Sequence, residues 1–307
     1  MLYETPIIFF SNGIPIAGRF FRNTARVDER QPGVLVTGSW LTVKEQMPAV
    51  YAKKLAEAGY TAFTFDFSGF GESQGKLRQA EIPARKINDI IFAAEFISTI
   101  SFVDPKRIGH LAICASAQYT LAAMARGANI DSFASVAGWF HDAKSVAPFY
   151  GGAEGVSLRL ERAREAIDRY LKSGDVVTVP AYEAGNDRAG MFFPVDYYAK
   201  PDRGAIPEWK NEMAEMSWLY WLTFDGLSVV DEVSTPVLFV HGDGCVLPEN
   251  VKDVHSRLTG EKDMVWTDGS QVDFYDQPVL VNKAMAAVVP WFERTLRKDR
   301  EKIRKAA

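Results

Sequence analysis

The chain has 307 residues, 47% of them hydrophobic and 24% charged, so it is long and apolar enough to bury a large core. A formal net charge of −4 and a pI near 5.7 argue against nucleic acid and an anionic membrane surface as partners. No apolar run approaches the length of a membrane span, and the N-terminal MLYETPIIFF lacks the basic region of a signal peptide.

Short apolar runs alternate with stretches of helical apolar spacing along the first 140 residues. The runs predict strands at 6–13, 14–21, 32–40, 61–67, 107–114 and 132–140. Apolar residues that recur on one helical face predict helices over 43–59, 81–100 and 116–126. The Asn12-Gly13 pair predicts the turn between the first two strands, and a glycine-rich loop follows at 68–75.

The pattern changes between residues 141 and 231, where aromatic residues are dense and prolines and glycines interrupt any clean period. Regular alternation returns with strands predicted at 235–243 and 263–269 and helices predicted near 249–258 and 279–298. We therefore expect one main domain formed by residues 1–140 and 232–307, with residues 141–231 inserted as an aromatic-rich cap. The basic tail, residues 294–307, is expected to be a solvated helix end.

Strands that alternate with helices predict an α/β fold, with a mostly parallel central sheet and helices on both of its faces. Ligands of such sheets bind at the carboxyl ends of the strands. We therefore expect the functional site to be built by the loops that follow residues 38, 67, 114, 139, 243 and 270.

The chain has two cysteines, Cys114 and Cys245, which are too few for a disulfide framework and favour a reducing, cytoplasmic setting. No CxxC or HExxH spacing indicates a metal site, and no P-loop or GxGxxG sequence after a strand indicates a nucleotide. We therefore expect no metal and no cofactor. The sequence leaves a monomer and a homodimer both open.

Five segments carry a resemblance to a known family. They are VTGSW, FDFSGFGESQG, DPKRIGHLAICAS, TPVLFVHGD and DGSQVDFYDQP, in this order along the chain. With them the chain resembles the α/β-hydrolase fold superfamily over nearly its whole length, and more narrowly the dienelactone-hydrolase-related bacterial hydrolases. The resemblance implies the α/β-hydrolase fold and a nucleophile on a tight turn between a strand and a helix, the nucleophile elbow.

The resemblance places Cys114 at the nucleophile position of the elbow, with Ala112 and Ser116 where small residues are required. A helix N-terminus at this point would favour the thiolate through its dipole and its free N–H groups. Ser116 is the alternative nucleophile, although Gln118 would then occupy a position that needs a small residue. A third interpretation makes Cys114 an inert buried side chain.

The family's oxyanion hole uses two backbone N–H groups. The resemblance implies the N–H of Ala115 as one donor. The second donor is expected in the turn after the VLVTG strand, at Ser39, Trp40 or Leu41.

The family's catalytic histidine and acid are replaced here. The histidine position corresponds to Gln271, which cannot accept a proton at neutral pH, and the acid position corresponds to Gly244, with Asp243 one residue earlier as the candidate acid. His141 follows a strand that ends at the same edge of the sheet, so it is a candidate relocated base, oriented by Asp142. The alternative is that His141 is a loop histidine that hydrogen-bonds the cap.

Aromatic residues near the predicted elbow suit a pocket for an apolar or aromatic small molecule. Trp139 lies near the end of a site-facing strand, and Asp273, Tyr275 and Asp276 follow Gln271, so these residues are candidates to line this pocket together with Ser39–Leu41. Further aromatic residues of the cap are the candidates for its outer wall, or for an ordinary core: Phe193, Tyr197, Tyr198, Trp209, Trp218 and Trp221.

The first functional hypothesis is a hydrolase or acyl-transfer enzyme that acts on an ester, lactone or thioester of an apolar small molecule through the elbow residue. The second is a non-hydrolytic enzyme of the same fold, such as a cyclase, isomerase or lyase, or a ligand-binding protein. The intact elbow favours the first hypothesis, and Gln271 at the usual histidine position favours the second.

Overall fold

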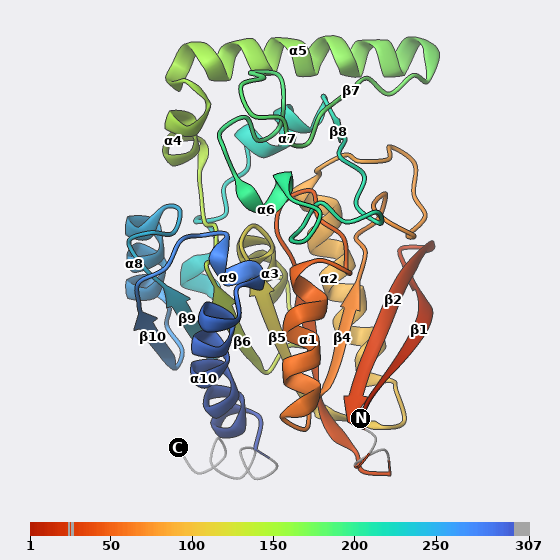
Figure 1. Ribbon diagram of the computed structural model, residues 1–307, viewed down its shortest axis with the longest axis vertical. Coiled ribbons are helices and arrows are strands. Elements are labelled where there is room, and N and C mark those ends of the chain that lie inside the picture. The colour runs from red at the N-terminus through yellow and green to blue at the C-terminus, as the bar shows by residue number, and fades with distance from the viewer. Residues whose placement is uncertain (24, 26–27, 298–307) are drawn as a thin grey trace.

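The structure, a computed structural model, describes residues 1–23, 25 and 28–297 (Figure 1). Within these residues the chain forms an eight-stranded sheet in the order β1-β2-β4-β3-β5-β6-β9-β10. The strands are β1 (Leu2–Ser11), β2 (Ile14–Asn23), β3 (Gln31–Thr37), β4 (Thr61–Phe65), β5 (Val103–Ile113), β6 (Ser132–Val136), β9 (Val237–His241) and β10 (Lys262–Trp266).

Most of the sheet is parallel, as predicted. β2 pairs antiparallel with both β1 and β4, and every other pair in the sheet is parallel. Asn12 and Gly13 have φ values of 47° and 78°, both in the left-handed region, so they form the tight turn that the sequence predicted between β1 and β2.

The central strands are buried because helices cover both faces of the sheet. Figure 1 shows α1 and α10 on one face and α2 and α3 on the other. The main helices are α1 (Met47–Glu57), α2 (Pro83–Ser98), α3 (Ser116–Ala125), α8 (Pro248–Arg257) and α10 (Pro278–Thr295). β4, β6 and β9 are accordingly buried at every residue, and β3 at every residue except Pro32, instead of alternating between buried and exposed positions.

Several predicted elements end earlier than expected, among them β6 and α10. β6 stops at Val136 instead of residue 140, because Ala137 has a φ of 45° and turns the chain toward the carboxyl edge of the sheet. α10 ends at Thr295, and residues 298–307 of the predicted helical tail lie outside the described residues. No helix among the described residues has the length and apolar character to cross a membrane.

The segment between β6 and β9 lies over the carboxyl ends of the parallel strands, with α5 outermost (Figure 1). Its elements are α4 (Ala143–Val146), η2 (Ala147–Tyr150), α5 (Gly152–Ser173), β7 (Thr178–Val179), α6 (Asp196–Ala199), β8 (Met213–Ala214), α7 (Ser217–Leu222) and η3 (Val230–Glu232). Hydrogen bonds join it to the β3–α1 loop: among them, Trp209 Nε1–H donates to the Leu41 carbonyl at 2.8 Å, and Gln46 Nε2–H donates to the Gly204 carbonyl at 2.6 Å.

Candidate active site

Cys114 lies on a strained turn between β5 and α3. Its φ of 59° is in the left-handed region, which residues other than glycine seldom adopt and which costs about 1–3 kcal/mol. Neighbouring backbone holds the turn, because Cys114 N–H donates to Val136 and the Cys114 carbonyl accepts from Trp139 N–H at 3.0 Å. The turn presents Cys114 to the cavity described below.

Ser116, the alternative nucleophile, has a different environment. Its side chain is buried, its Oγ donates to the Ile113 carbonyl at 3.2 Å, and it begins helix α3. Ser116 does not line the cavity, whereas Cys114 does. The geometry of the turn therefore favours Cys114 as the reactive residue.

The backbone N–H groups of Ala115 and Trp40 lower the pKa of the Cys114 thiol. The Ser39 and Tyr275 side chains lower it too, so all four groups favour the thiolate. Burial has the largest effect, however, and raises the pKa of the Cys114 thiol overall, so the thiol is neutral at pH 7. The helix N-terminus expected to favour the thiolate does not outweigh this burial.

Among the three candidates for the second N–H donor, Trp40 is the one that acts on Cys114. The Leu41 N–H instead donates to Glu81 Oε2 at 3.2 Å, and Leu41 does not line the cavity. Trp40 and Ala115 therefore place two backbone N–H groups beside one sulfur.

A cavity of about 460 Å³ lies in front of Cys114. One wall is aromatic and contains Trp40, Trp139, Tyr150 and Trp221, with the rings of Trp40 and Trp221 stacked 4.9 Å apart. Tyr150 and Trp221 belong to the segment between β6 and β9, so core and overlying segment build the cavity together. This wall suits an apolar or aromatic ligand.

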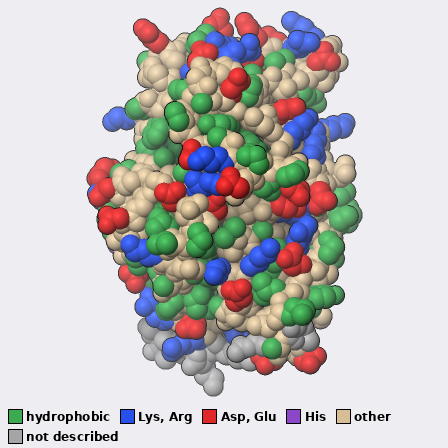
Figure 2. Space-filling view, viewed as in Figure 1, with side chains coloured by type: hydrophobic (Ala, Val, Ile, Leu, Met, Phe, Trp, Pro, Cys, Tyr) green, Lys and Arg blue, Asp and Glu red, His purple; other side chains and the backbone are tan. Residues whose placement is uncertain are grey.

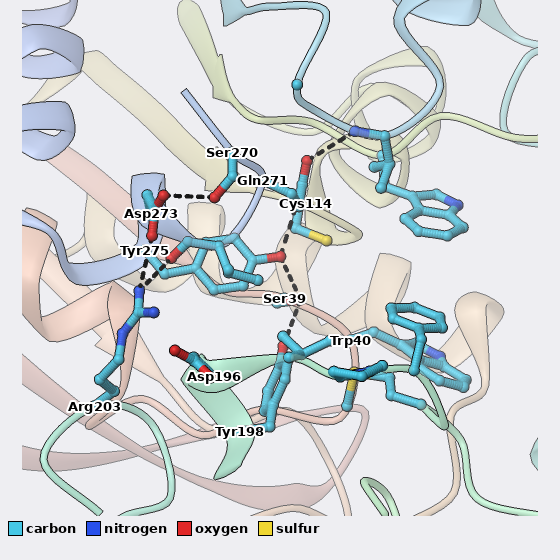
Figure 3. A pocket seen from close by; sticks show the side chains of 18 of the residues that line it. Ser39, Trp40, Cys114, Asp196, Tyr198, Arg203, Ser270, Gln271, Asp273 and Tyr275 are labelled. Carbon is cyan, nitrogen blue, oxygen red and sulfur yellow. Dashed lines mark hydrogen bonds and ion pairs between the residues drawn. The ribbon is translucent and has the colours of Figure 1, made fainter. Parts of the chain in front are cut away.

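A row of hydroxyl groups forms the polar wall beside Cys114 (Figure 3). Tyr198 OH donates to Ser39 Oγ at 3.1 Å, and Ser39 Oγ lies 3.3 Å from Tyr275 OH. Burial raises the pKa values of Tyr198 and Tyr275 well above the usual value for tyrosine, so both phenols stay protonated. They can therefore donate hydrogen bonds to a ligand, but they cannot act as bases.

No family model matches the chain. The crystal structure of the hypothetical protein PA2218 of Pseudomonas aeruginosa superposes with a TM-score of 0.84 at 25% identity, covering 96% of this chain and 94% of that one. The α/β hydrolase GrgF of Penicillium sp. sh18 superposes with a TM-score of 0.79 at 20% identity, covering 96% and 99% of the two chains. The chain has the α/β-hydrolase fold.

A curated relative adds a sequence likeness. Polyketide transferase claH of Penicillium crustosum is 24% identical over 273 residues, which cover 82% of this chain and 84% of that protein. In the α/β-hydrolase fold each catalytic group has a usual place in the loops after particular strands. The residues around Cys114 can therefore be compared with these places.

Gln271 lies in the loop after the last strand, β10, where the resemblance places the position of the family's histidine, and it lines the cavity. Its Nε2 donates to the Ala137 carbonyl at 2.7 Å and to Tyr275 OH at 3.2 Å, while its Oε1 accepts from Val246 N–H at 3.1 Å. The amide therefore fixes Tyr275 and two loops, but it cannot remove a proton from Cys114.

His141 is not placed as a relocated base. Trp139 Nε1–H donates to His141 Nδ1 at 2.7 Å, so the proton of the ring is on Nε2, which lies 2.9 Å from the Trp221 carbonyl. Burial lowers the pKa of His141 to about 4, and the side chain does not line the cavity. Asp142 caps α4 through Ser145 instead of orienting the ring. The structure therefore does not support the relocated-base hypothesis.

The other titratable candidates also lie away from Cys114. Asp243 is exposed and does not line the cavity, where its neighbour Gly244 is found instead. His110 is enclosed between the hydroxyls of Thr37 and Thr120, at 2.8 and 3.3 Å. In the part of the chain that the structure describes, no histidine lines the cavity and no cluster of three or more His, Cys, Asp or Glu residues could hold a metal ion.

The structure adds two charged residues, Arg203 and Asp196, at the mouth of the cavity that the sequence did not single out. Arg203 lies between core and overlying segment, and its Nη2 donates to Asp276 Oδ1 at 2.6 Å and to Asp273 Oδ1 at 3.4 Å. Asp196 lies beside it, and Ser270 lies beyond Asp273, to which its Oγ donates at 2.6 Å (Figure 3). Figure 2 shows this area, over α6, as basic side chains flanked by acidic ones. The charged stretch DYYAKPDRG was the one sequence signal for it.

Proposed function

We propose that the protein is an α/β-hydrolase-type enzyme that transfers the acyl group of an ester, lactone or thioester of an apolar small molecule through Cys114. One observation carries this proposal: a cysteine at a φ of 59° on the elbow lines a cavity, and two backbone N–H groups act on its sulfur. Such strain persists where the surrounding structure enforces it and where function uses it. The likeness to a protein named a polyketide transferase supports transfer of an acyl group.

The reaction begins when the substrate carbonyl carbon meets Cys114 Sγ and its oxygen points between Trp40 N–H and Ala115 N–H. A sulfur–carbon bond forms, and the bond from the carbonyl carbon to the leaving group breaks. The thiol proton passes to the leaving group, with Ser39 and Tyr275 as the hydroxyl groups that can relay it. Water or a second substrate then takes the acyl group from sulfur and returns a proton to it.

The substrate's apolar part is proposed to lie against Trp139, Tyr150 and Trp221. This assigns residues 141–231 as a cap that selects the substrate. The aromatic wall of the cavity and the position of the segment over the carboxyl ends of the strands support this assignment (Figure 1).

The test is a panel of aryl esters, aryl thioesters and lactones with apolar acyl groups, read by product release and by the intact mass of the protein. Wild type is expected to gain the mass of the acyl group on Cys114. The Cys114→Ala variant should gain none, and the matched control Ser116→Ala should behave as wild type. A mass gain that persists in Cys114→Ala and is lost in Ser116→Ala would reverse the assignment.

Gln271 favours a second function, a non-hydrolytic cyclisation, isomerisation or lyase reaction, or binding alone, in the same cavity. Its amide holds the place of the histidine that would activate water for hydrolysis. This alternative predicts that Cys114→Ala retains the affinity of wild type for an apolar carbonyl ligand and that no acyl adduct forms in either protein. Isothermal titration beside the mass measurement separates the two functions.

A further inference from the structure

Glu81 is a fully buried carboxylate in the loop that precedes α2. Its Oε2 accepts from Lys86 Nζ at 2.7 Å and from Leu41 N–H at 3.2 Å, and its Oε1 accepts from Tyr119 OH at 2.7 Å. Its own N–H donates to Ser217 Oγ at 2.9 Å, in the segment that covers the sheet edge. Glu81 does not line the cavity, so its four partners define what it does.

A buried ion pair of this kind needs an explanation other than stability. Lys86 is also buried, its Nζ lies 4.7 and 4.5 Å from the ring centroids of Phe67 and Phe70, and burial lowers its pKa against the opposing effect of Glu81. Removing two charges from water costs about as much as their attraction returns, and apolar replacements are often neutral or stabilising. The pair is therefore kept for the geometry that it imposes.

That geometry concerns the two N–H donors beside Cys114. Leu41 has a φ of 60°, and its N–H bond to Glu81 fixes the turn in which the preceding N–H, that of Trp40, faces the sulfur. Tyr119 lies in the first turn of α3, the helix whose start carries the Ala115 N–H. A single carboxylate thus holds the β3–α1 turn with one oxygen and the elbow helix with the other.

We infer that Glu81 is a positioning residue that sets the separation between the Trp40 and Ala115 N–H groups, with Lys86 as its counter-charge. The inference rests on the proposed function, because it assigns these N–H groups to a substrate oxyanion. Glu81 acts through Leu41 and Tyr119 and touches neither the substrate nor Cys114. If these donors are displaced, the oxyanion hole is impaired. Removing a single donor from such a hole lowers kcat by about 10²- to 10³-fold.

The test uses the double variant Glu81→Leu/Lys86→Met, which removes both bonds that Glu81 accepts from Leu41 and Tyr119 and leaves no buried lysine without its counter-charge. The double variant is expected to stay folded but to melt at a lower temperature than wild type, because Leu41 N–H and Tyr119 OH lose their buried acceptor. Its kcat for the best ester or thioester of the panel should fall about 10- to 100-fold with KM within about threefold of wild type. The matched control Arg188→Met/Glu215→Gln removes another ion pair of the covering segment, outside the cavity, and should leave both constants unchanged.

A second readout needs no turnover. An aryl trifluoromethyl ketone accepts the Cys114 sulfur at its carbonyl carbon, which forms a carbon–sulfur bond and an oxyanion and releases the thiol proton to solvent. Its affinity, followed by ¹⁹F NMR, should fall in the double variant by the same factor as kcat. The matching alcohol, which forms no oxyanion, should bind both proteins equally.

The two possible failures are distinct. If wild type forms no adduct with the ketone, the proposed function fails and the inference fails with it. If wild type forms the adduct and the folded double variant keeps both the ketone affinity and kcat of wild type, Glu81 has only a structural role and the inference alone is overturned.

Discussion

At the scale of single residues, His141 supports the cavity wall instead of the chemistry. Its two ring nitrogens hold the Trp139 indole and the Trp221 carbonyl. In the variant His141→Phe the buried Trp139 N–H loses its acceptor, which should lower the free energy of unfolding by about 1–3 kcal/mol. We expect kcat to change less than about tenfold, whereas loss of a catalytic base costs about 10² or more. Urea unfolding measures the change in stability, and steady-state kinetics with one aryl ester of the panel measures the change in kcat.

A thousandfold loss of kcat in a His141→Phe variant with native tryptophan fluorescence would contradict this role. The matching positive control is Cys114→Ala, which should lose the reaction entirely at wild-type fluorescence. The comparison is direct because the two side chains act on opposite sides of the same aromatic wall: Cys114 lines the cavity, and His141 lies behind Trp139.

Residues that directly follow a strand could be located from the sequence, and residues that act through distant partners could not. Cys114, Trp40 and Gln271 lie in the loops at the carboxyl edge of the sheet, where the order of the strands fixes them in space. Glu81 lies 40 residues from Leu41, and Arg203 lies 73 residues from Asp276. Glu81 lies at the start of a predicted helix and Arg203 in a segment without a period, and no local pattern links either to its partner.

At the scale of elements, Arg203 joins the α6 region to α9 (Asp273–Asp276). Its guanidinium donates to both carboxylate oxygens of Asp276 through Nε, at 3.2 and 2.9 Å, and to the Val272 carbonyl at 3.0 Å. In Arg203→Ala we expect faster amide hydrogen exchange in peptides covering 195–209 and 270–277, with the central strands unchanged. Bidentate geometry makes the loss larger than for an ordinary surface pair.

The control for this element prediction is Lys200→Ala, which removes an exposed ion pair with Asp196 one turn away on α6. Exposed pairs contribute about 0–1 kcal/mol, so exchange in the same peptides should stay close to wild type. Equal acceleration by both variants would mean that general loss of charge loosens the region, and that Arg203 has no special role in joining it to α9.

The strands and helices of the core could be predicted from the sequence because the spacing of apolar residues reflects which positions are buried. The strands of the core are rich in apolar residues and buried nearly throughout, since helices cover both faces. The 22-residue helix α5 was not predicted, although its C-cap glycine, Gly174, follows the usual rule. Only Arg159, Ala163 and Ala166 of α5 are buried, so its apolar stripe is too weak to separate a helix from an irregular segment.

At the scale of the whole molecule, three histidines are buried in uncharged form around the sheet. Burial lowers the pKa of His110 to about 3 and the pKa values of His141 and His241 to about 4. In the unfolded chain each regains a pKa near 6.5. Between these values the unfolded state binds more protons than the folded state, so acid favours unfolding. The stability that the neutral rings provide is complete above pH 6.5 and is lost as the pH falls toward 4.

We therefore expect the free energy of unfolding to fall as the pH is lowered from 6.5 to 5, by about 1 kcal/mol per pH unit for each of these histidines. His141→Phe is less stable at pH 7, but its free energy of unfolding should change less steeply with pH. The slope should be smaller by the contribution of one proton. His255→Phe, a change at a partly exposed position on α8, should alter the dependence less. Urea unfolding at four pH values measures each slope, and identical slopes for wild type and His141→Phe would mean that His141 is already protonated in the folded protein. A charged imidazole has no acceptor nitrogen, so a protonated His141 could not accept the hydrogen bond from Trp139 Nε1–H. The assignment of His141 as a neutral residue behind the cavity wall depends on that bond and would then be wrong.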